Sequence, residues 1–553
     1  MILKEEWRPA DGLTLEPGAL RAVKEEVRSV MLIAGPGTGK TEMLAQRADF
    51  LLRTGVSCYP KRILAISFKV DASTNLKERV SKRCGYELSS RFDSYTFAAF
   101  AKFLIDRYRC VLVGNNALDW DYVIGKKRNV PKEITFKDLL PLAIHIVKNS
   151  SQARNLLQQT YSDVFLDEFQ DCTKEQYEFV KLAFHNTGAR LVAVGDSKQK
   201  IMVWAGAFEG VFNSFKKDFN ALELRIYRNF RSKPRLLRVQ NSIIKSLDPG
   251  AAMLESDIQG DEGEVYIEEF ADERDEAKAL VALIEKWNKE DRVPLSEIAV
   301  LISQKVEDHA KELMNELRNH QIPYRNENEL QDITVEPLAR LIVDFLSCVY
   351  VERSPDSWER LNGMLAPFMS EENPKIKQES LYLFLQKKEI EVIKNKNTSI
   401  SLNQWKLDAK QFIIFIGKEV CASLAPGYDS LERFRQVYRE TISKIEKLNE
   451  LTNDLRVSLL LFSGNEQIKI LTIHKSKGLE FDNVIIMGVE EEVFRDGKDD
   501  SRCVFFVGVT RARRRLVLTY AKNRTFSNRC VVDRKPKTQF LSYVLPHVSR
   551  EKI

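Results

Sequence analysis

The stretch that decides the fold is Ala34–Thr41, AGPGTGKT. It directly follows the apolar run VMLIA, which is typical of a buried strand, and it opens a segment with helical spacing from Lys40 to Leu52. Glycines let a backbone fold around phosphate oxygens, while successive N–H groups and a helix N-terminus supply positive potential. Strand, loop and helix together predict a phosphate-binding loop, although Ala34 stands where the usual pattern has glycine.

The side chains of this loop predict ATP and Mg²⁺ as ligands. Lys40 is placed to reach the β- and γ-phosphates, and the Thr41 hydroxyl is placed to bind Mg²⁺. The residues expected to hold ATP in this loop are Ala34, Gly35, Gly37, Thr38, Gly39, Lys40 and Thr41.

An acidic pair predicts the second half of the site. VFLDEFQD, Val164–Asp171, reads as a buried strand that ends in Asp167 and Glu168. Such a strand delivers carboxylates to the C-terminal edge of a parallel sheet, where α/β folds bind ligands. Asp167 is suited to hold Mg²⁺ through water, and Glu168 to orient or deprotonate an attacking water.

Further apolar runs alternate with amphipathic stretches, which predicts an α/β fold. Continuous strands are expected at 62–68 and 190–196 in the first part of the chain. A second series is expected at 297–303, 468–474, 483–489 and 515–521. Alternating strands and helices indicate parallel sheets covered on both faces, so we expect two such modules.

Each module is expected to be interrupted by a mostly helical insertion. The first interruption covers residues 106–155 and the second covers residues 353–464. Within the second, the segment from Ser430 has apolar residues at helical spacing, from Leu431 and Phe434 to Leu448. Either a partner-binding helix or core packing explains that spacing, and core packing is favoured.

The bulk composition permits a nucleic-acid partner without requiring one. The 553 residues suggest three to four domains, and Lys plus Arg exceed Asp plus Glu by only 85 to 79. Eight scattered cysteines without a CxxC pair argue against a metal cluster or a disulfide scaffold. We expect a reduced cytoplasmic protein without a membrane span, because the longest apolar run, 341–351, contains Asp344.

Eight segments in order resemble the motifs of the UvrD/Rep/PcrA group of superfamily 1A DNA helicases. The phosphate loop and DEFQD are two of these motifs. The others are SFKVDAS (67–73), YTFAAFA (95–101), VGDSKQKIMVWAGA (194–207), RNFRS (228–232), TIHKSKGLEFDNV (472–484) and VGVTRARRRL (507–516).

The resemblance implies two RecA-like P-loop domains with ATP between them and single-stranded DNA across the top. Domain 1A would comprise residues 1–105 and 156–221, with 106–155 as the inserted subdomain 1B. Domain 2A would comprise residues 222–352 and 465–553, with 353–464 as the helical subdomain 2B.

The resemblance also implies roles for single residues. Gln199 would sense the γ-phosphate, while Arg231 and Arg511 would act as arginine fingers on the developing charge. Phe230 would stack on adenine, and Glu480 would lie near the nucleotide sugar. The residues expected to contact DNA are Phe68, Phe97, Trp204 and His474.

Departures from the family pattern concern the base and the DNA. Ala19 stands where a glutamine reads the adenine edge, and Glu42 replaces an arginine of the base pocket. On the DNA side, Ala98 replaces a histidine, while Met202 and Ala205 replace a tyrosine and an arginine. The hydrolysis residues are intact, so we expect ATPase activity with loose discrimination between bases.

The leading expectation is therefore an ATP-hydrolysing motor that moves 3′→5′ on single-stranded DNA and unwinds tailed duplexes, as in DNA repair. The alternative is a DNA-sensing ATPase that regulates a separate nuclease or ATPase subunit in anti-phage defence. In compactness the chain is similar to the helicase partner of the Gabija system. A self-contained helicase-nuclease is disfavoured, because little chain follows the motif at 507–516 and no carboxylate or cysteine cluster appears there.

Overall fold

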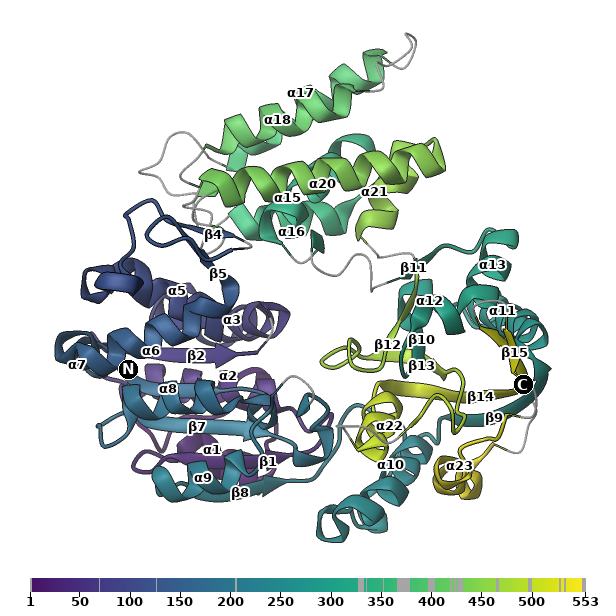
Figure 1. Ribbon diagram of the computed structural model, residues 1–553, viewed down its shortest axis with the longest axis horizontal. Helices are drawn as coiled ribbons and strands as arrows, with labels where there is room; N and C mark the ends of the chain where they lie inside the picture. Colours follow the sequence, from purple (N-terminus) through teal and green to yellow (C-terminus); the bar gives the residue numbers. More distant parts are fainter. Residues whose placement is uncertain are drawn as a thin grey trace. The chain divides into compact units, whose positions relative to one another are not determined.

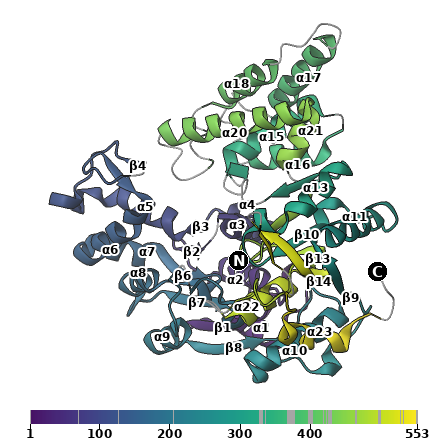
Figure 2. The same cartoon turned by 45° about the vertical axis from the view of Figure 1, so that its right-hand side comes forward.

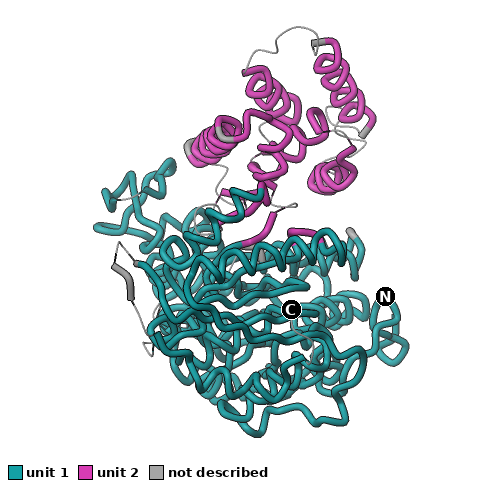
Figure 3. The backbone as a smooth tube through the Cα atoms, turned by 90° about the vertical axis from the view of Figure 1, so that its right-hand side faces the viewer, with its two compact units in different colours: residues 1–293, 297–320, 470–553 teal, residues 294–296, 321–469 magenta. Residues whose placement is uncertain are grey.

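The computed structural model describes residues 2–549 except 69, 126, 204–205, 327–332, 335, 352, 366–377, 396–402, 418–419, 422–423, 425–430, 464–466, 496–499, 527–528 and 532–533. Two compact units are distinguished in Figure 3. One comprises residues 1–293, 297–320 and 470–553, and the other comprises 294–296 and 321–469. The first expected α/β domain lies in the first unit, and so does the second except for residues 294–296, 321–352 and 465–469.

The first α/β domain is built on a six-stranded parallel sheet of order β3-β2-β6-β7-β1-β8. Its strands are β1 (Val30–Ala34), β2 (Arg62–Ser67), β3 (Phe92–Thr96), β6 (Tyr161–Leu166), β7 (Arg190–Gly195) and β8 (Leu222–Ile226). The four predicted strands and their parallel pairing are confirmed. The unpredicted strands, β3 and β8, lie at the two edges, where FDSYT and LELRI include polar residues that interrupt an apolar run.

Helices cover both faces of this sheet (Figure 1). Neighbouring residues of β1 show this coverage. Met31 packs in one core cluster with α5 (Phe97–Tyr108) and α8, while Leu32 packs in another with α1 and α2. The helices outside the inserted region are α1 (Pro17–Lys24), α2 (Lys40–Arg53), α3 (Val70–Cys84), α4 (Tyr86–Ser89), α8 (Lys174–Phe184) and α9 (Val211–Asp218).

The first inserted region contains both helices and a short sheet. Its helices are α6 (Leu139–Asn149) and α7 (Ser151–Thr160), which extends past residue 155, and its strands are β4 (Val123–Gly125) and β5 (Glu133–Thr135). Helix α5 leads into the region and overlaps it only at residues 106–108. The two strands pair in parallel, a feature that the sequence did not indicate. Leu142 and Ile146 of α6 are buried in the core cluster of the first domain, so this helix is anchored to the domain that the region interrupts.

The second α/β domain has a sheet in which β10, β13, β14 and β9 each pair in parallel with the next, and β12 lies beside β10 on its other side (Figure 1). Figure 2 shows β10, β13, β14 and β9 from another direction. The unpredicted strand β9 reads EVYIEEFAD, and its acidic residues hide the strand pattern. The strands are β9 (Glu264–Asp272), β10 (Ile298–Ile302), β12 (Ile468–Thr472), β13 (Phe481–Ile486), β14 (Ala512–Phe526) and the antiparallel β15 (Arg529–Val531). The helices are α10 (Pro234–Leu247), α11 (Glu273–Lys289), α12 (Val306–His309), α13 (Lys311–Asn319), α22 (Ser501–Val509) and α23 (Thr538–Val544).

The second unit is helical, with the short strand β11 (Tyr324–Asn326). Its core includes Phe345 stacked on Phe412 at 4.1 Å between ring centroids. Val437 and Ile445 are fully buried there, which confirms core packing for the helix near 430–450. The helices are α15 (Pro337–Tyr350), α16 (Pro355–Leu365), α17 (Gln378–Asn395), α18 (Gln404–Ile416), α20 (Leu431–Thr452) and α21 (Leu455–Ser463).

Two elements bear on the expected domain boundaries. The expected boundary between residues 221 and 222 assigns β8 to the second domain. The structure instead places β8 at the edge of the first sheet. α15, expected in domain 2A, packs in the core of the helical unit, where Asp344 is paired with Arg360 at 2.6 Å. The remaining boundaries stay predictions. No helix among the described residues is long and apolar enough to cross a membrane.

We predict that Asp163→Ala destabilises the first domain. Asp163 and Arg47 are fully buried, their charged atoms lie 3.6 Å apart, and Asp163 also accepts two hydrogen bonds from Arg190 at 2.6 and 2.9 Å. Removing the carboxylate leaves buried cations uncompensated, which costs about 3–5 kcal/mol. Urea unfolding followed by circular dichroism measures the change. The exposed ion-pair variant Glu223→Ala should change the free energy of unfolding by less than ~1 kcal/mol.

Candidate nucleotide-binding site

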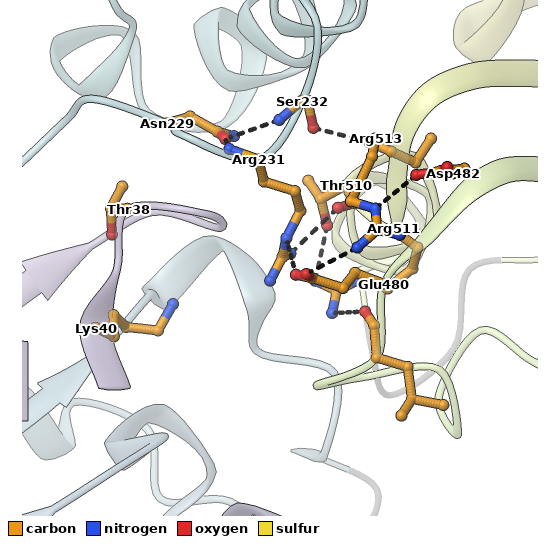
Figure 4. Close-up of polar contacts among 12 residues, drawn as sticks. Thr38, Lys40, Asn229, Arg231, Ser232, Glu480, Asp482, Thr510, Arg511 and Arg513 are labelled. Carbon is orange, nitrogen blue, oxygen red and sulfur yellow. Dashed lines mark hydrogen bonds and ion pairs between the residues drawn. The ribbon is translucent and has the colours of Figure 1, made fainter. Parts of the chain in front are cut away.

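The phosphate loop is curled between the end of β1 and the start of α2. Gly37 and Gly39 have φ angles of +68° and +80°, a conformation that glycine adopts without strain. The Thr38 hydroxyl donates a hydrogen bond to the Gly35 carbonyl at 2.9 Å, and Lys40 Nζ donates to the same carbonyl at 3.1 Å. Figure 4 shows Thr38 and Lys40 on this loop. Thr41 follows as the second residue of α2, where it is partly buried.

The segment 228–232, which follows β8, lies directly on this loop. The Phe230 N–H donates to the Gly37 carbonyl at 2.9 Å. A Cβ atom added at Gly37 would lie 2.6 Å from Cβ of Arg231 and 2.9 Å from Cγ of Asn229. The Phe230 ring is 58% exposed, with the Arg228 guanidinium 5.1 Å from its centroid. An exposed aromatic face beside the phosphate loop is the arrangement that base stacking requires.

The acidic pair lies where β6 ends. Asp167 is buried, and Glu168 has a left-handed backbone with φ +50°. Burial and the neighbouring charge of Glu168 raise the pKa of Asp167, although Lys40 opposes this effect. Burial also raises the pKa of Glu168, but the nearby Lys40 and Lys477 outweigh it and the net pKa is lowered. Glu168 is therefore the member of the pair that is held ionised.

A chain of buried amides and carboxylates continues from Glu168. Gln170 Nε2 donates to Glu168 Oε2 at 2.6 Å, and Gln170 Oε1 accepts from the Asp196 N–H at 3.0 Å. Asp196 in turn accepts a hydrogen bond from Gln199 Nε2 at 3.1 Å. Sequence reasoning missed Gln170, whose signal was its place inside DEFQD. The chain fixes the orientation of Glu168 relative to Gln199.

Two arginines of the second domain complete this arrangement (Figure 4). Arg511 Nη2 donates to Gln199 Oε1 at 3.1 Å, and its Nε donates to the Val507 carbonyl at 3.0 Å. Arg231 Nε is paired with Glu480 Oε2 at 2.6 Å. Burial lowers the pKa of Arg511, and the adjacent Arg231 adds to this effect. The structure thus brings together Lys40, Asp167, Glu168, Gln199, Arg231 and Arg511, the predicted catalytic set.

Lys477 is a second contact between the domains that the sequence analysis did not single out. It is buried in the loop after β12, and its Nζ donates to Asp171 at 2.7 and 2.8 Å and to the Gln199 carbonyl at 2.8 Å. It also lies 4.0 Å from Glu168 Oε2. Its signal was a lysine inside a segment that already matched a family motif. Two domains therefore share one buried network of charges.

The residues predicted to contact DNA differ in how far they are buried. Phe97 is 4% exposed and packs against Phe68 at 5.3 Å between ring centroids, so its position does not support a direct contact with DNA. Phe68 and His474 are partly buried. Trp204 and Ala205 lie outside the described residues.

The two substituted base-pocket positions are occupied in different ways. Ala19 is buried in the face of α1 that packs on the sheet. Glu42 is paired with Arg83 at 2.8 Å and with Arg79 at 3.3 Å, and it accepts a hydrogen bond from Gln46 at 2.8 Å. Both carboxylate oxygens of Glu42 are thus engaged within the protein.

Comparison with known proteins gives one consistent family. The UvrD/REP helicase N-terminal domain matches residues 15–121 and 111–220, and the UvrD-like helicase C-terminal domain matches residues 224–399 and 418–523. The chain is 24% identical to the ATP-dependent DNA helicase PcrA of Bacillus subtilis over 96% of its own length and 85% of that protein's. It is 26% identical to DNA helicase II of Haemophilus influenzae over 71% of its own length, a match that spans 59% of the relative.

We predict that Gly37→Ala weakens ATP binding by about tenfold or more, because the new methyl group would collide with Asn229 and Arg231. Gly12→Ala is the matched control, since Gly12 has a similar φ of +66° but no atom within 4 Å of an added Cβ. Titration with a fluorescent ATP analogue measures both. Equal affinities for the two variants would show that the crowding at Gly37 is unimportant.

Proposed function

The chain belongs to the UvrD-like helicase family, and from this premise we propose that it hydrolyses ATP to move 3′→5′ along single-stranded DNA and to separate tailed duplexes. One observation carries the proposal: charged groups from two α/β domains converge beside the phosphate loop. Lys40 and Glu168 come from the first domain, and Arg231 and Arg511 come from the second. A site divided in this way links hydrolysis to the relative position of two domains.

The residues at the end of β6 and the start of α2 fit Mg²⁺. The Thr41 hydroxyl and the Asp167 carboxylate are oxygen donors of the kind that Mg²⁺ prefers. The raised pKa of Asp167 indicates a buried carboxylate whose charge a further cation would stabilise. When bound with ATP, the metal would neutralise charge on the β- and γ-phosphates. Thr41 and Asp167 are therefore the proposed metal ligands.

Glu168 is the proposed base for the attacking water. Its carboxylate is kept ionised by Lys40 and Lys477, so it can accept a proton near neutral pH. The hydrogen bond from Gln170 orients it, and the same chain of contacts leads to Gln199. Gln199 stands between the first domain and Arg511, a position from which it can respond to the γ-phosphate.

One loop joins the nucleotide to the DNA in this proposal. The segment after β12 carries His474, a predicted DNA contact, and Lys477, which is bonded to Asp171. Three residues later it carries Glu480, which is paired with Arg231. A change at the phosphates can therefore displace residues that hold the strand, because all three groups share one short backbone segment.

Strand displacement on tailed duplexes tests the proposed function. We expect ATP turnover to be stimulated by single-stranded DNA and duplexes with a 3′ tail to be separated, whereas 5′-tailed and blunt duplexes should remain paired. Lys40→Ala should abolish both activities, because it removes the cation that neutralises the phosphates. DNA-stimulated turnover without displacement would favour the alternative, a DNA-sensing ATPase that regulates a separate nuclease. Turnover that ignores DNA would contradict both functions.

The arginine fingers give a second prediction. Arg231→Ala and Arg511→Ala should each lower kcat by ~100-fold or more, with ATP affinity changed far less, because fingers act mainly on the transition state. Arg514→Ala is the matched control, since Arg514 belongs to the same motif but its side chain is 57% exposed. Steady-state ATPase assays with saturating DNA measure kcat. Parent-like turnover by both finger variants would exclude a site shared by the two domains.

Base selectivity gives a third prediction. Ala19 offers no hydrogen bond and Glu42 is engaged by Arg83, so neither position can reject a wrong base by leaving a polar group unpaired. Stacking on Phe230 is open to every base. We expect GTP, and CTP to a lesser degree, to support turnover within about tenfold of ATP, a difference of ~1.4 kcal/mol in activation free energy. Strict dependence on ATP in a nucleotide panel would show that another group reads adenine.

A further inference from the structure

Helix α17 of the helical unit has a buried face and an exposed face. Leu381, Leu385 and Lys388 are buried. Phe384 stacks on Phe415 of α18 at 4.4 Å between centroids, and Lys388 Nζ donates to Asp408 of α18 at 2.8 Å. These contacts account for one side of the helix and anchor it in its own unit.

The opposite side carries an apolar seam. Leu383, Gln386, Ile390 and Ile393 follow one another at intervals of three, four and three residues, the a-d-a-d spacing of a coiled coil. All four are exposed, and the three apolar residues are 58%, 44% and 64% exposed respectively. A second apolar stripe on a helix whose first face is already packed is typical of a surface that pairs with another helix.

Charged residues flank this seam in the pattern that selects coiled-coil partners. Lys387 and Lys394 occupy the e positions, and Tyr382 and Glu389 occupy the g positions. All four are exposed. In a parallel pair, each g residue faces the e residue five positions later on the other helix, so Glu389 of one copy faces Lys394 of the other. The pattern is therefore complementary to itself.

We propose that α17 pairs in parallel and in register with α17 of a second copy of this chain. In that register Gln386 meets its own counterpart, and the two amides satisfy each other as donor and acceptor. An antiparallel pair would instead place Gln386 against Ile390 and bring like charges together at Lys387 and at Glu389. The Gln386 amide in the seam and the charges that flank it thus both favour the parallel, two-fold arrangement.

Sedimentation velocity of the full chain over a range of concentrations tests the pairing. We expect a reversible dimer in the parent, and a dissociation constant raised about tenfold in Glu389→Lys and in Lys394→Glu, because each places like charges in contact twice per dimer. The double variant Glu389→Lys with Lys394→Glu should recover parent-like dimerisation. A chain that stays monomeric at every concentration overturns the proposal, as does a dimer that both single variants leave unchanged.

Site-directed cross-linking separates the two orientations. Gln386→Cys should form a disulfide-linked dimer under mild oxidation well beyond the parent, which already contains eight cysteines. Ile414→Cys is the matched control, because Ile414 is 69% exposed on the neighbouring helix α18 but lies outside the seam. Equal cross-linking by the two variants overturns the parallel register. Both substitutions are on exposed positions, so folding is preserved and ATP turnover should match the parent.

Discussion

The site depends on one buried lysine that the second α/β domain extends into the acidic edge of the first. Lys477 is bonded to Asp171 and to the carbonyl of Gln199, and it lies 4.0 Å from Glu168. Desolvating such a group is costly unless hydrogen-bonded carboxylates surround it. Lys477 can therefore occupy this buried position only while the two α/β domains are in contact. The electrostatic state of Glu168 depends in turn on that meeting, because Lys477 is one of the charges that lower its pKa.

A separate, local set of ion pairs compensates the charge of an unusual residue beside the phosphate loop. Glu42 places a carboxylate in the first turn of α2, and Arg83 and Arg79 from α3 neutralise it there. The extra negative charge is thus compensated locally, which leaves the positive potential of the loop and Lys40 available for phosphate. The residue at this base-pocket position can therefore change without altering the charges that bind phosphate, because Glu42 is paired with side chains of α3.

Local patterns predicted most of the fold and half of the site. The phosphate loop, the acidic pair and eight strands, four in each domain, follow from neighbouring residues, because an apolar run next to glycines or carboxylates is visible within ten positions. The sequence did not predict the edge strands β3 and β8 or the acidic strand β9, since the burial of these strands comes from partners far along the chain. Lys477 was not singled out for a related reason, because its contact with Asp171 spans 306 residues. Gln170 bonds to Glu168 only two positions away, but the sequence does not show that its amide is turned toward that carboxylate. Phe97 shows the converse, because a motif match does not reveal which of two adjacent rings is buried.

The most direct test of a site shared by two domains is single-turnover hydrolysis by Lys477→Ala, with ATP affinity measured in parallel. Lys477 belongs to the second domain, yet it lies 4.0 Å from Glu168 of the first and contributes to lowering the pKa of that carboxyl. We expect the hydrolysis rate to fall by about tenfold or more, because the bonds from Lys477 to Asp171 and Gln199 that position the site between the two domains are lost, while the Kd for ATP changes by less than about threefold. An unchanged rate in a folded Lys477→Ala variant would contradict the account.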